Sequence, residues 1–107
     1  MGAERRRSER KVVRRPVVIA VGGRPVAEGK TLDVSMEGLS LVVSNPMKPG
    51  AKCAVSFDLP RNGKFSKVSA AARVVWCALS GGEGFHVGLE FETVDAAAAK
   101  AIDEFLS

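Results

Sequence analysis

The sequence has few of the residues that cross-link a chain, bind metals or catalyse reactions. Its 107 residues include two cysteines, one histidine, one tryptophan and no tyrosine. Two widely separated cysteines and one histidine do not make a disulfide framework or a cysteine-rich zinc site. No stretch approaches the roughly 18 apolar residues of a membrane helix, which excludes an integral membrane protein. The length fits one domain.

Signatures of catalysis and secretion are also missing. The sequence shows no Ser/His/Asp or Cys/His pattern that would indicate a hydrolase. Glu90 and Glu92 lie two apart on one predicted strand face, which is more typical of a solvated edge than of an acid/base pair. We therefore expect no enzymatic activity. The basic N-terminus is not followed by an apolar segment, so it is not a secretory signal, and the expected compartment is the reducing cytoplasm.

Positive charge is concentrated at the start of the chain. Overall, 16 Lys and Arg stand against 12 Asp and Glu, which gives a formal charge of +4. Residues 1–15 carry seven basic and two acidic side chains, or +5, whereas residues 16–107 carry nine and ten, or −1. This remainder has no extended basic face, so binding of a nucleic-acid polymer along the whole surface is not expected.

Six segments alternate apolar and polar residues with the period of two that is typical of half-buried strands. The dipeptides Gly22-Gly23 and Asn62-Gly63 suit the turns of β-hairpins. Near the end of the chain the apolar residues recur at helical spacing, which predicts one terminal helix. The predicted strands cover residues 12–21, 24–32, 39–44, 53–59, 65–79 and 85–92, and the helix covers residues 94–106.

Short strands joined by turns predict an all-β fold with a terminal helix: a six-stranded antiparallel β-barrel with a C-terminal α-helix. Closure of the barrel removes exposed strand edges, and the helix can cover one opening. We expect a single domain, in which residues 1–11 form a flexible Arg-rich leader and residues 12–107 form the barrel with its helix.

Three conspicuous side chains have simple structural interpretations. Trp76 shares a predicted strand face with Val74 and Ala72, which favours a role in the core or in helix packing over a base-stacking surface. Cys53 lies on an apolar face and is expected to be a small buried hydrophobe, while Cys77 is expected to be partly exposed.

An arginine cluster precedes the first predicted strand and consists of Arg5, Arg6, Arg7 and Arg10. A guanidinium group offers five donors in a planar fork, matches phosphate oxygens or the O6/N7 edge of guanine, and stacks on purine rings. The cluster therefore suits a nucleotide ligand. From charge alone, however, a solvated basic tail is the favoured interpretation, because runs of like charge are commonly disordered.

A second motif, Asp33-Val34-Ser35-Met36-Glu37-Gly38, lies at the junction between two predicted strands. Asp and Ser favour turns through hydrogen bonds from side chain to backbone, and Gly permits a positive φ or the close approach of a ligand. Taken alone, the composition of this motif favours its interpretation as a well-formed turn.

Together the two segments resemble the motifs of PilZ domains, a family found in bacterial signalling proteins. Residues 6–10 match the family's RxxxR element, and residues 33–38 match its [D/N]xSxxG element. Residues 72–76 (Ala-Arg-Val-Val-Trp) and 87–91 (Val-Gly-Leu-Glu-Phe) are also similar to the family. The resemblance therefore spans nearly the whole chain.

A second RxxxR of equal spacing runs from Arg10 to Arg14. In the family, the second arginine usually lies a few residues ahead of a Pro-containing first strand, and Pro16 fits when Arg10 is that arginine. We therefore prefer the first register, with Arg5 and Arg14 as fallback ligand-binding residues.

The resemblance implies binding of cyclic di-GMP, a bacterial second messenger with two guanines and two bridging phosphates. In this picture arginines clamp a phosphate and the guanine Hoogsteen edge, an aspartate and a serine accept and donate at another guanine, and a glycine allows close approach. The residues so implied are Arg6, Arg10 and the helper Arg7, together with Asp33, Ser35 and Gly38. No metal or other cofactor is expected.

The leading hypothesis is a receptor or adaptor domain that changes conformation or partner surface when cyclic di-GMP binds, and that acts on a downstream protein of unknown identity. One alternative is a PilZ-like module that binds a protein and not the nucleotide, and another is a small barrel that binds nucleic acid through its basic arm. Two intact motifs favour the receptor, and the lack of interleaved aromatics disfavours the nucleic-acid barrel. The number of bound nucleotides and the oligomeric state stay open.

Overall fold

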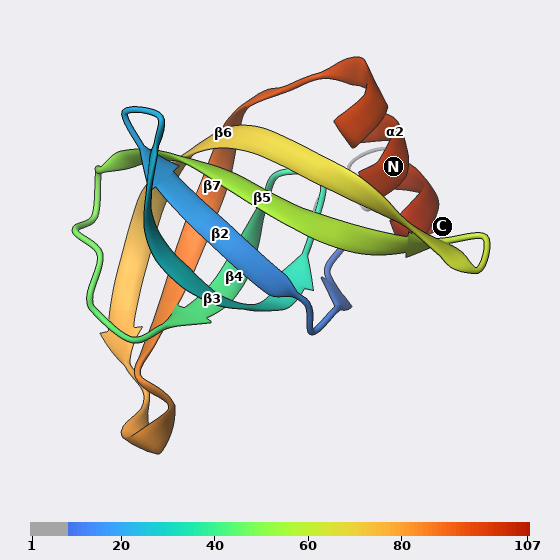
Figure 1. The fold of residues 1–107 in the computed structure, drawn as a ribbon. Helices are drawn as coiled ribbons and strands as arrows, with labels where there is room; N and C mark the ends of the chain where they lie inside the picture. Colours follow the sequence, from blue (N-terminus) through green and yellow to red (C-terminus); the bar gives the residue numbers. More distant parts are fainter. Residues whose placement is uncertain (1–8) are drawn as a thin grey trace.

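Residues 9–107 are the part of the chain that the computed structural model describes, and within them seven antiparallel strands precede one helix (Figure 1). The strands are β1 (Lys11–Val12), β2 (Pro16–Val21), β3 (Arg24–Val34), β4 (Gly38–Val43), β5 (Lys52–Arg61), β6 (Lys64–Leu79) and β7 (Phe85–Val94). A 3-10 turn, η1 (Gly81–Glu83), links β6 to β7, and the helix α2 (Ala96–Leu106) follows β7.

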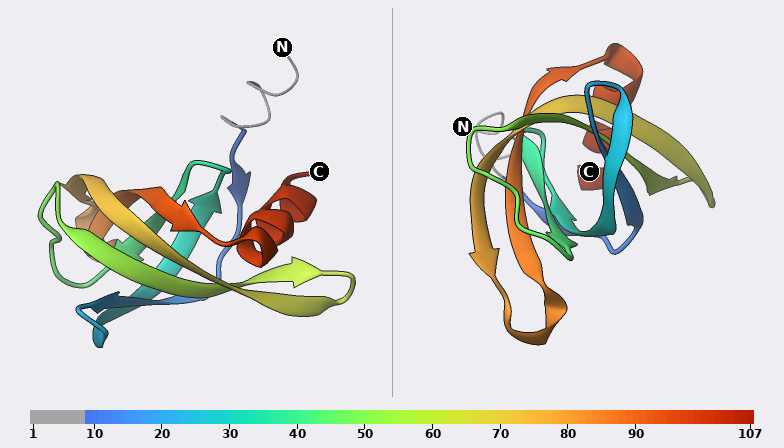
Figure 2. Two further views of the ribbon diagram at one scale, coloured as in Figure 1. Left: turned by 90° about the horizontal axis from the view of Figure 1, so that it is seen from above. Right: turned by 60° about the vertical axis from the view of Figure 1, so that its left-hand side comes forward.

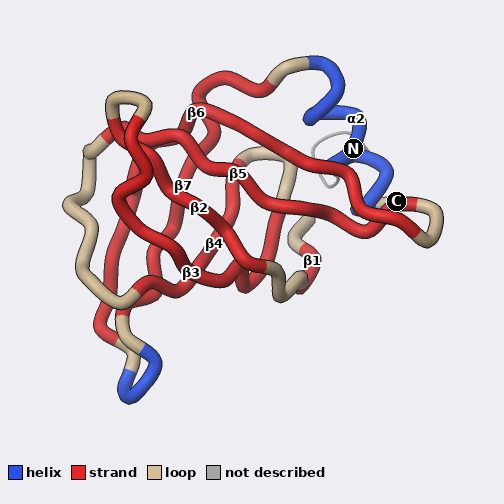
Figure 3. The backbone as a smooth tube through the Cα atoms, in the orientation of Figure 1, coloured by secondary structure: helices blue, strands red, loops and turns tan. Residues whose placement is uncertain are grey.

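Six of these strands close into a ring through their backbone hydrogen bonds. The order β3-β2-β5-β6-β7-β4 returns to β3 through an additional β3–β4 pairing, and short β1 adds to the far end of β3. Figure 2 shows the ring from two further directions, and Figure 3 shows how little of it is loop. The predicted fold class is confirmed: the chain is mostly β, antiparallel and closed, with a C-terminal helix.

Two hairpin turns lie where their dipeptides predicted them. Gly22 and Gly23 both have positive φ (60° and 81°) between β2 and β3, and Asn62 and Gly63 (49° and 76°) do the same between β5 and β6. Positive φ at both central residues gives the turn a twist that matches that of the flanking strands. The Asn62-Gly63 turn sets the register of the whole β5–β6 hairpin, whereas the β2–β3 register shifts by one residue between Ile19 and Ala20.

The first predicted strand, 12–21, is wrong as a continuous element because it breaks between Val12 and Pro16. The buried hydroxyl of Thr31 in β3 accepts from the Arg15 N–H (2.9 Å) and donates to the Val13 carbonyl. Pro16 has no N–H to donate to a ladder. The Thr31 side chain thus takes the place of backbone partners at residues 13–15, and the predicted single strand is divided into β1 and β2.

Inward-facing aliphatic residues of all six long strands make one core, and α2 packs against it beside β5 and β6. The predicted helix start at 94 is also wrong. Val94 still pairs with Ala70 as the end of β7, and Asp95 caps the helix by accepting from the Ala98 N–H at 2.7 Å. Within residues 9–107 no helix has the length and apolarity needed to cross a membrane.

The two cysteines lie in different environments, as predicted. Cys53 is buried in β5, whereas Cys77 in β6 is partly exposed. Burial raises the pKa of the Cys53 thiol, and the nearby carboxylate of Glu92 raises it further. Since the thiolate is the reactive form, a disulfide reagent at pH 8 is expected to modify Cys77 quickly and Cys53 only after denaturation. The number of thiols modified, measured from the leaving group that the reagent releases before and after denaturation, checks this. Rapid modification of both cysteines in the native protein would contradict it.

Candidate functional site

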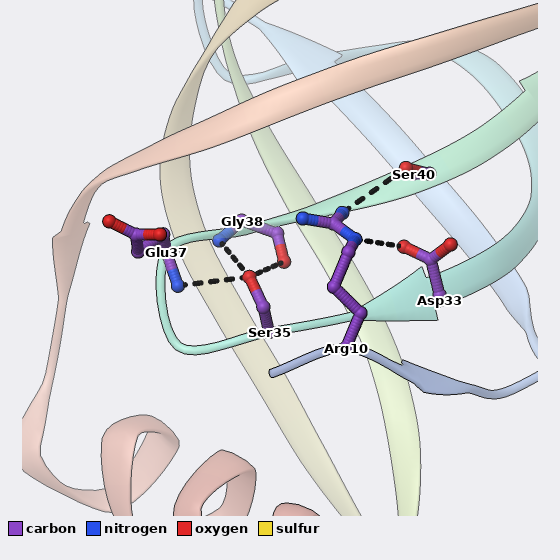
Figure 4. A network of polar contacts seen from close by, with 6 residues as sticks. All are labelled: Arg10, Asp33, Ser35, Glu37, Gly38 and Ser40. Carbon is purple, nitrogen blue, oxygen red and sulfur yellow. Dashed lines mark hydrogen bonds and ion pairs between the residues drawn. The ribbon is translucent and has the colours of Figure 1, made fainter. Parts of the chain in front are cut away.

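Residues 9–15, here called the N-terminal segment, lie beside the turn between β3 and β4 because β1 pairs with the end of β3. Lys11 lies opposite Val34, and Val12 lies opposite Asp33. This register places Arg10, the residue just before β1, beside the second sequence motif. Figure 4 shows Arg10 beside Asp33, Ser35, Glu37 and Gly38 of this motif.

Arg10 bridges two polar groups of the turn region. Its Nε lies 2.8 Å from Oδ1 of Asp33, and its Nη2 donates to Oγ of Ser40 at 3.2 Å. The side chains of Arg10 and Asp33 are 45% and 29% exposed, so this ion pair contributes only about 0.2–1 kcal/mol to stability. Both groups therefore remain available to a ligand that offers better partners.

Ser35 holds the turn in shape. The residue is fully buried, and its hydroxyl accepts from the N–H groups of Glu37 (3.1 Å) and Gly38 (3.2 Å). The same hydroxyl lies 3.3 Å from the Gly38 carbonyl, to which it can donate, and the Ser35 N–H donates to that carbonyl at 2.9 Å. Its polar capacity is used inside the turn, so here Ser35 positions its neighbours.

Gly38 is required by a close approach of backbone. It begins β4 opposite Glu90 of β7, and a Cβ at this position would lie 1.9 Å from the Leu89 carbonyl oxygen. The Phe91 N–H also donates to the Glu37 carbonyl at 2.8 Å, which holds the turn against β7. Gly38 therefore has a structural role in the pairing of β4 with β7, and its predicted contact with a ligand stays a prediction.

A cavity of about 410 Å³ opens beside Arg10. Its walls come from the N-terminal segment, the β3–β4 turn, β4, β6 and β7. The lining residues are Arg10, Glu37, Gly38, Ser40, Val75, Trp76, Gly88, Leu89 and Glu90. The Glu90 carboxylate is paired with Arg73 at 2.7 Å, which leaves Arg10 and Glu37 as the other charged groups of the wall.

Trp76 forms one wall of this cavity, and its predicted place in the core is wrong. The β6 register shifts between Val74 and Trp76, so that Val75 and Trp76 both face outward, 44% and 45% exposed. The indole lies over Gly88, where an added Cβ would come within 2.1 Å of Nε1. The alternating pattern hides this bulge, and Gly88 opposite Trp76 is the one sequence feature that agrees with it.

The structure brings some of the predicted residues together and not others. Arg10, Asp33, Ser35 and Gly38 meet at the β3–β4 turn. Arg14 is exposed, does not line the cavity, and makes no hydrogen bond or ion pair with any residue of 9–107. The remaining predicted residues, Arg5, Arg6 and Arg7, lie outside the described part of the chain.

Comparison with protein families gives one assignment for nearly the whole chain: residues 4–107 match the model of the PilZ domain. The chain belongs to the PilZ domain family. PilZ domains are regulatory receptor domains, and the family is associated with cyclic di-GMP. Comparison with the curated proteins found no match.

Solved structures with this PilZ fold include three with low sequence identity. Bacillus subtilis MotI/DgrA, an inhibitor of motility, has a TM-score of 0.79 at 16% identity, over 91% of this chain and 47% of that one. The present chain thus spans less than half of MotI. The PilZ domain of Escherichia coli YcgR, solved with c-di-GMP, has a TM-score of 0.67 at 13% identity, over 94% and 88%. The PilZ domain of CeSA from a cellulose-synthesizing bacterium has 0.61 at 19%, over 92% and 95%.

Proposed function

We propose that this PilZ domain is a cyclic di-GMP receptor that changes its conformation or its partner surface when the nucleotide binds. The observation that carries the proposal is a guanidinium and an exposed indole on one cavity, with a carboxylate paired to that guanidinium. Arg10 and Trp76 line that cavity, and Asp33 lies within 2.8 Å of Arg10. Nothing in this arrangement requires the domain to be an enzyme.

The three groups match the chemistry of the nucleotide. The fork of Arg10 suits a bridging phosphate or the O6/N7 edge of guanine. The carboxylate of Asp33 accepts hydrogen bonds and so suits the N–H groups of a second guanine. The face of Trp76 suits stacking of a purine ring. In the full proposal Arg6 and Arg7 add further phosphate contacts.

Binding requires Arg10 to exchange partners. In the ligand-free protein the guanidinium is held by Asp33 and Ser40. A phosphate that draws Arg10 away releases Asp33 for a guanine, so one movement uncovers two binding groups. Lys11, the next residue, donates to the Phe105 carbonyl of α2 at 3.0 Å and lies over the Phe105 ring. A shift of the N-terminal segment therefore reaches the helix directly.

The location and action of the domain complete the proposal. We place it in a bacterial cytoplasm, where cyclic di-GMP is made, and we expect it to act on a protein partner. The nucleotide can shift the domain from one conformation to the other only by binding the second conformation more tightly than the first.

Trp76 is the single tryptophan of the sequence, so its fluorescence reports on the cavity. Adding cyclic di-GMP is expected to change this fluorescence saturably in the micromolar range, because a guanine that stacks on the indole alters its surroundings. GTP serves as the control nucleotide. A fluorescence signal that stays constant, together with no retention of the nucleotide in equilibrium dialysis, would argue against the receptor function.

Substitution of Trp76 separates stacking from electrostatics. Trp76→Ala is expected to weaken nucleotide binding by about tenfold or more, since stacking of a base on an aromatic ring contributes about 1–3 kcal/mol. Gly88→Ala keeps the indole but displaces it, because its Cβ would overlap the ring. Equilibrium dialysis should give weakened binding for both variants. Wild-type affinity in both would show that Trp76 does not contact the ligand.

A further inference from the structure

The hairpin of β6 and β7 extends past the ring, at the end away from α2 (Figure 1). Trp76 and Cys77 are consecutive residues of β6, so their side chains point to opposite faces. Trp76 pairs with Gly88 on the face that carries the cavity beside Arg10, here called the nucleotide cavity. Cys77 pairs with buried Val87. The hairpin thus presents a second face that the proposed receptor function does not use.

This second face and the loop between β4 and β5 border an open cavity of about 410 Å³, here called the hairpin cavity. The lining is apolar apart from one lysine and one thiol. It consists of Pro46, Met47, Lys48, Pro49, Cys77, Leu79 and Phe85. No residue lines both cavities, so the hairpin cavity and the nucleotide cavity can be occupied at the same time.

One apolar side chain of the hairpin cavity is strongly exposed. Leu79 is 72% exposed, although Met47, Cys77 and Phe85 beside it already pack against the core. Covering a leucine side chain removes its apolar surface from water, which favours association. The volume lies within the range of natural ligand cavities and has room for a few apolar side chains.

The charge at the rim indicates what kind of segment fits. Lys48 is exposed and makes no ion pair with any residue of 9–107. The acidic group of the hairpin tip, Glu83, lies 3.2 Å from Nε2 of His86. A segment that places apolar side chains in the cavity and a carboxylate beside Lys48 therefore satisfies both features of the surface.

We propose that the hairpin cavity docks an amphipathic helix of a partner protein, with an apolar stripe against Leu79 and Phe85 and an acidic residue against Lys48. A helix suits the site because residues at i, i+3, i+4 and i+7 form one stripe while charged residues flank it. Docking at this face leaves the nucleotide cavity open, because no residue lines both cavities. The domain would then receive its signal on one face of the hairpin and hold its partner on the other.

A synthetic probe tests the docking site on the full chain. The probe is a fluorescently labelled helical peptide with leucines at i, i+3, i+4 and i+7 and glutamates on its flanks. Its scrambled sequence, which lacks the stripe, is the control peptide. We expect saturable binding of the probe, measured by anisotropy, and slower modification of the Cys77 thiol in its presence. Binding of the scrambled peptide with equal affinity would overturn the proposal.

Matched variants assign the binding to this cavity. Leu79→Ser is expected to weaken probe binding by about tenfold, and Val26→Ser, an exposed residue of β3 outside the cavity, is expected to leave it unchanged. Lys48→Glu should weaken binding by about threefold or more and reduce its salt dependence, whereas Lys67→Glu on β6 should not. Equal affinities within either pair would overturn the proposal.

A second copy of the chain is the competing occupant. Sedimentation equilibrium decides between the two, with the wild type expected to be monomeric in the absence of the peptide. A wild-type dimer that Leu79→Ser converts to monomer would overturn the assignment to a partner protein, because the chain itself would then fill the cavity.

Discussion

Replacing Arg10 with alanine is expected to weaken cyclic di-GMP binding by about 10- to 100-fold, because a charge-assisted hydrogen bond contributes about 1.5–3 kcal/mol. Among residues 9–107, Arg10 is the basic residue that lines the nucleotide cavity. In the ligand-free protein it also forms an ion pair with Asp33. Calorimetric titration of both proteins measures the difference. The variant should remain folded, because its ion pair with Asp33 is partly exposed and weak.

Two further variants show whether position or charge decides the loss. Arg14→Ala removes the same charge from the same segment, but Arg14 lies outside the cavity and has no polar contact with the described residues. It should bind as the wild type does. Arg10→Lys keeps the charge without the planar fork and should recover only part of the affinity. If Arg14→Ala loses as much affinity as Arg10→Ala, the second RxxxR register is the functional one.

Replacing Gly38 with alanine is expected to lower the free energy of unfolding by about 3 kcal/mol. The added Cβ would lie 1.9 Å from the Leu89 carbonyl oxygen, so β4 and β7 must move apart where they close the ring. For a domain of this size, thermal denaturation should show a Tm lower by more than about 10 °C.

Gly82→Ala is the matched control, because a Cβ at Gly82 meets no atom within 4 Å and Gly82 is not among the glycines with positive φ. Its effect should stay within about 0.5 kcal/mol. If Gly38→Ala is as stable as Gly82→Ala, the close pairing of β4 with β7 at this turn is not as described. Weak nucleotide binding by folded Gly38→Ala would then have to come from direct contact with the ligand.

Much of the fold could be predicted because its rules are local. Alternation of apolar and polar residues identified the six long strands, and the Gly-Gly and Asn-Gly dipeptides marked two hairpin turns with positive φ. Closure of the ring followed from the avoidance of exposed edges. The break after Val12 could not be predicted, since it depends on a hydroxyl of Thr31 in another strand.

The candidate site was only partly predictable for the same reason. The resemblance placed Arg10 and Asp33 together, and the structure joins them at 2.8 Å. Trp76 was assigned to the wrong face because one bulge after Val74 reverses the alternation, and a pattern of period two contains no sign of a bulge. Trp76 therefore lines the candidate site, although the sequence pattern predicts it in the core.

The central claim is that this PilZ domain binds cyclic di-GMP, and calorimetric titration of the wild-type chain with the purified dinucleotide tests it most directly. The account predicts a saturable heat signal at micromolar ligand that GTP does not reproduce. The fitted stoichiometry would also give the number of nucleotides bound per chain. Absence of heat and of saturation in that range, for a protein whose thermal unfolding confirms that it is folded, would contradict the account and leave a protein-binding module in its place.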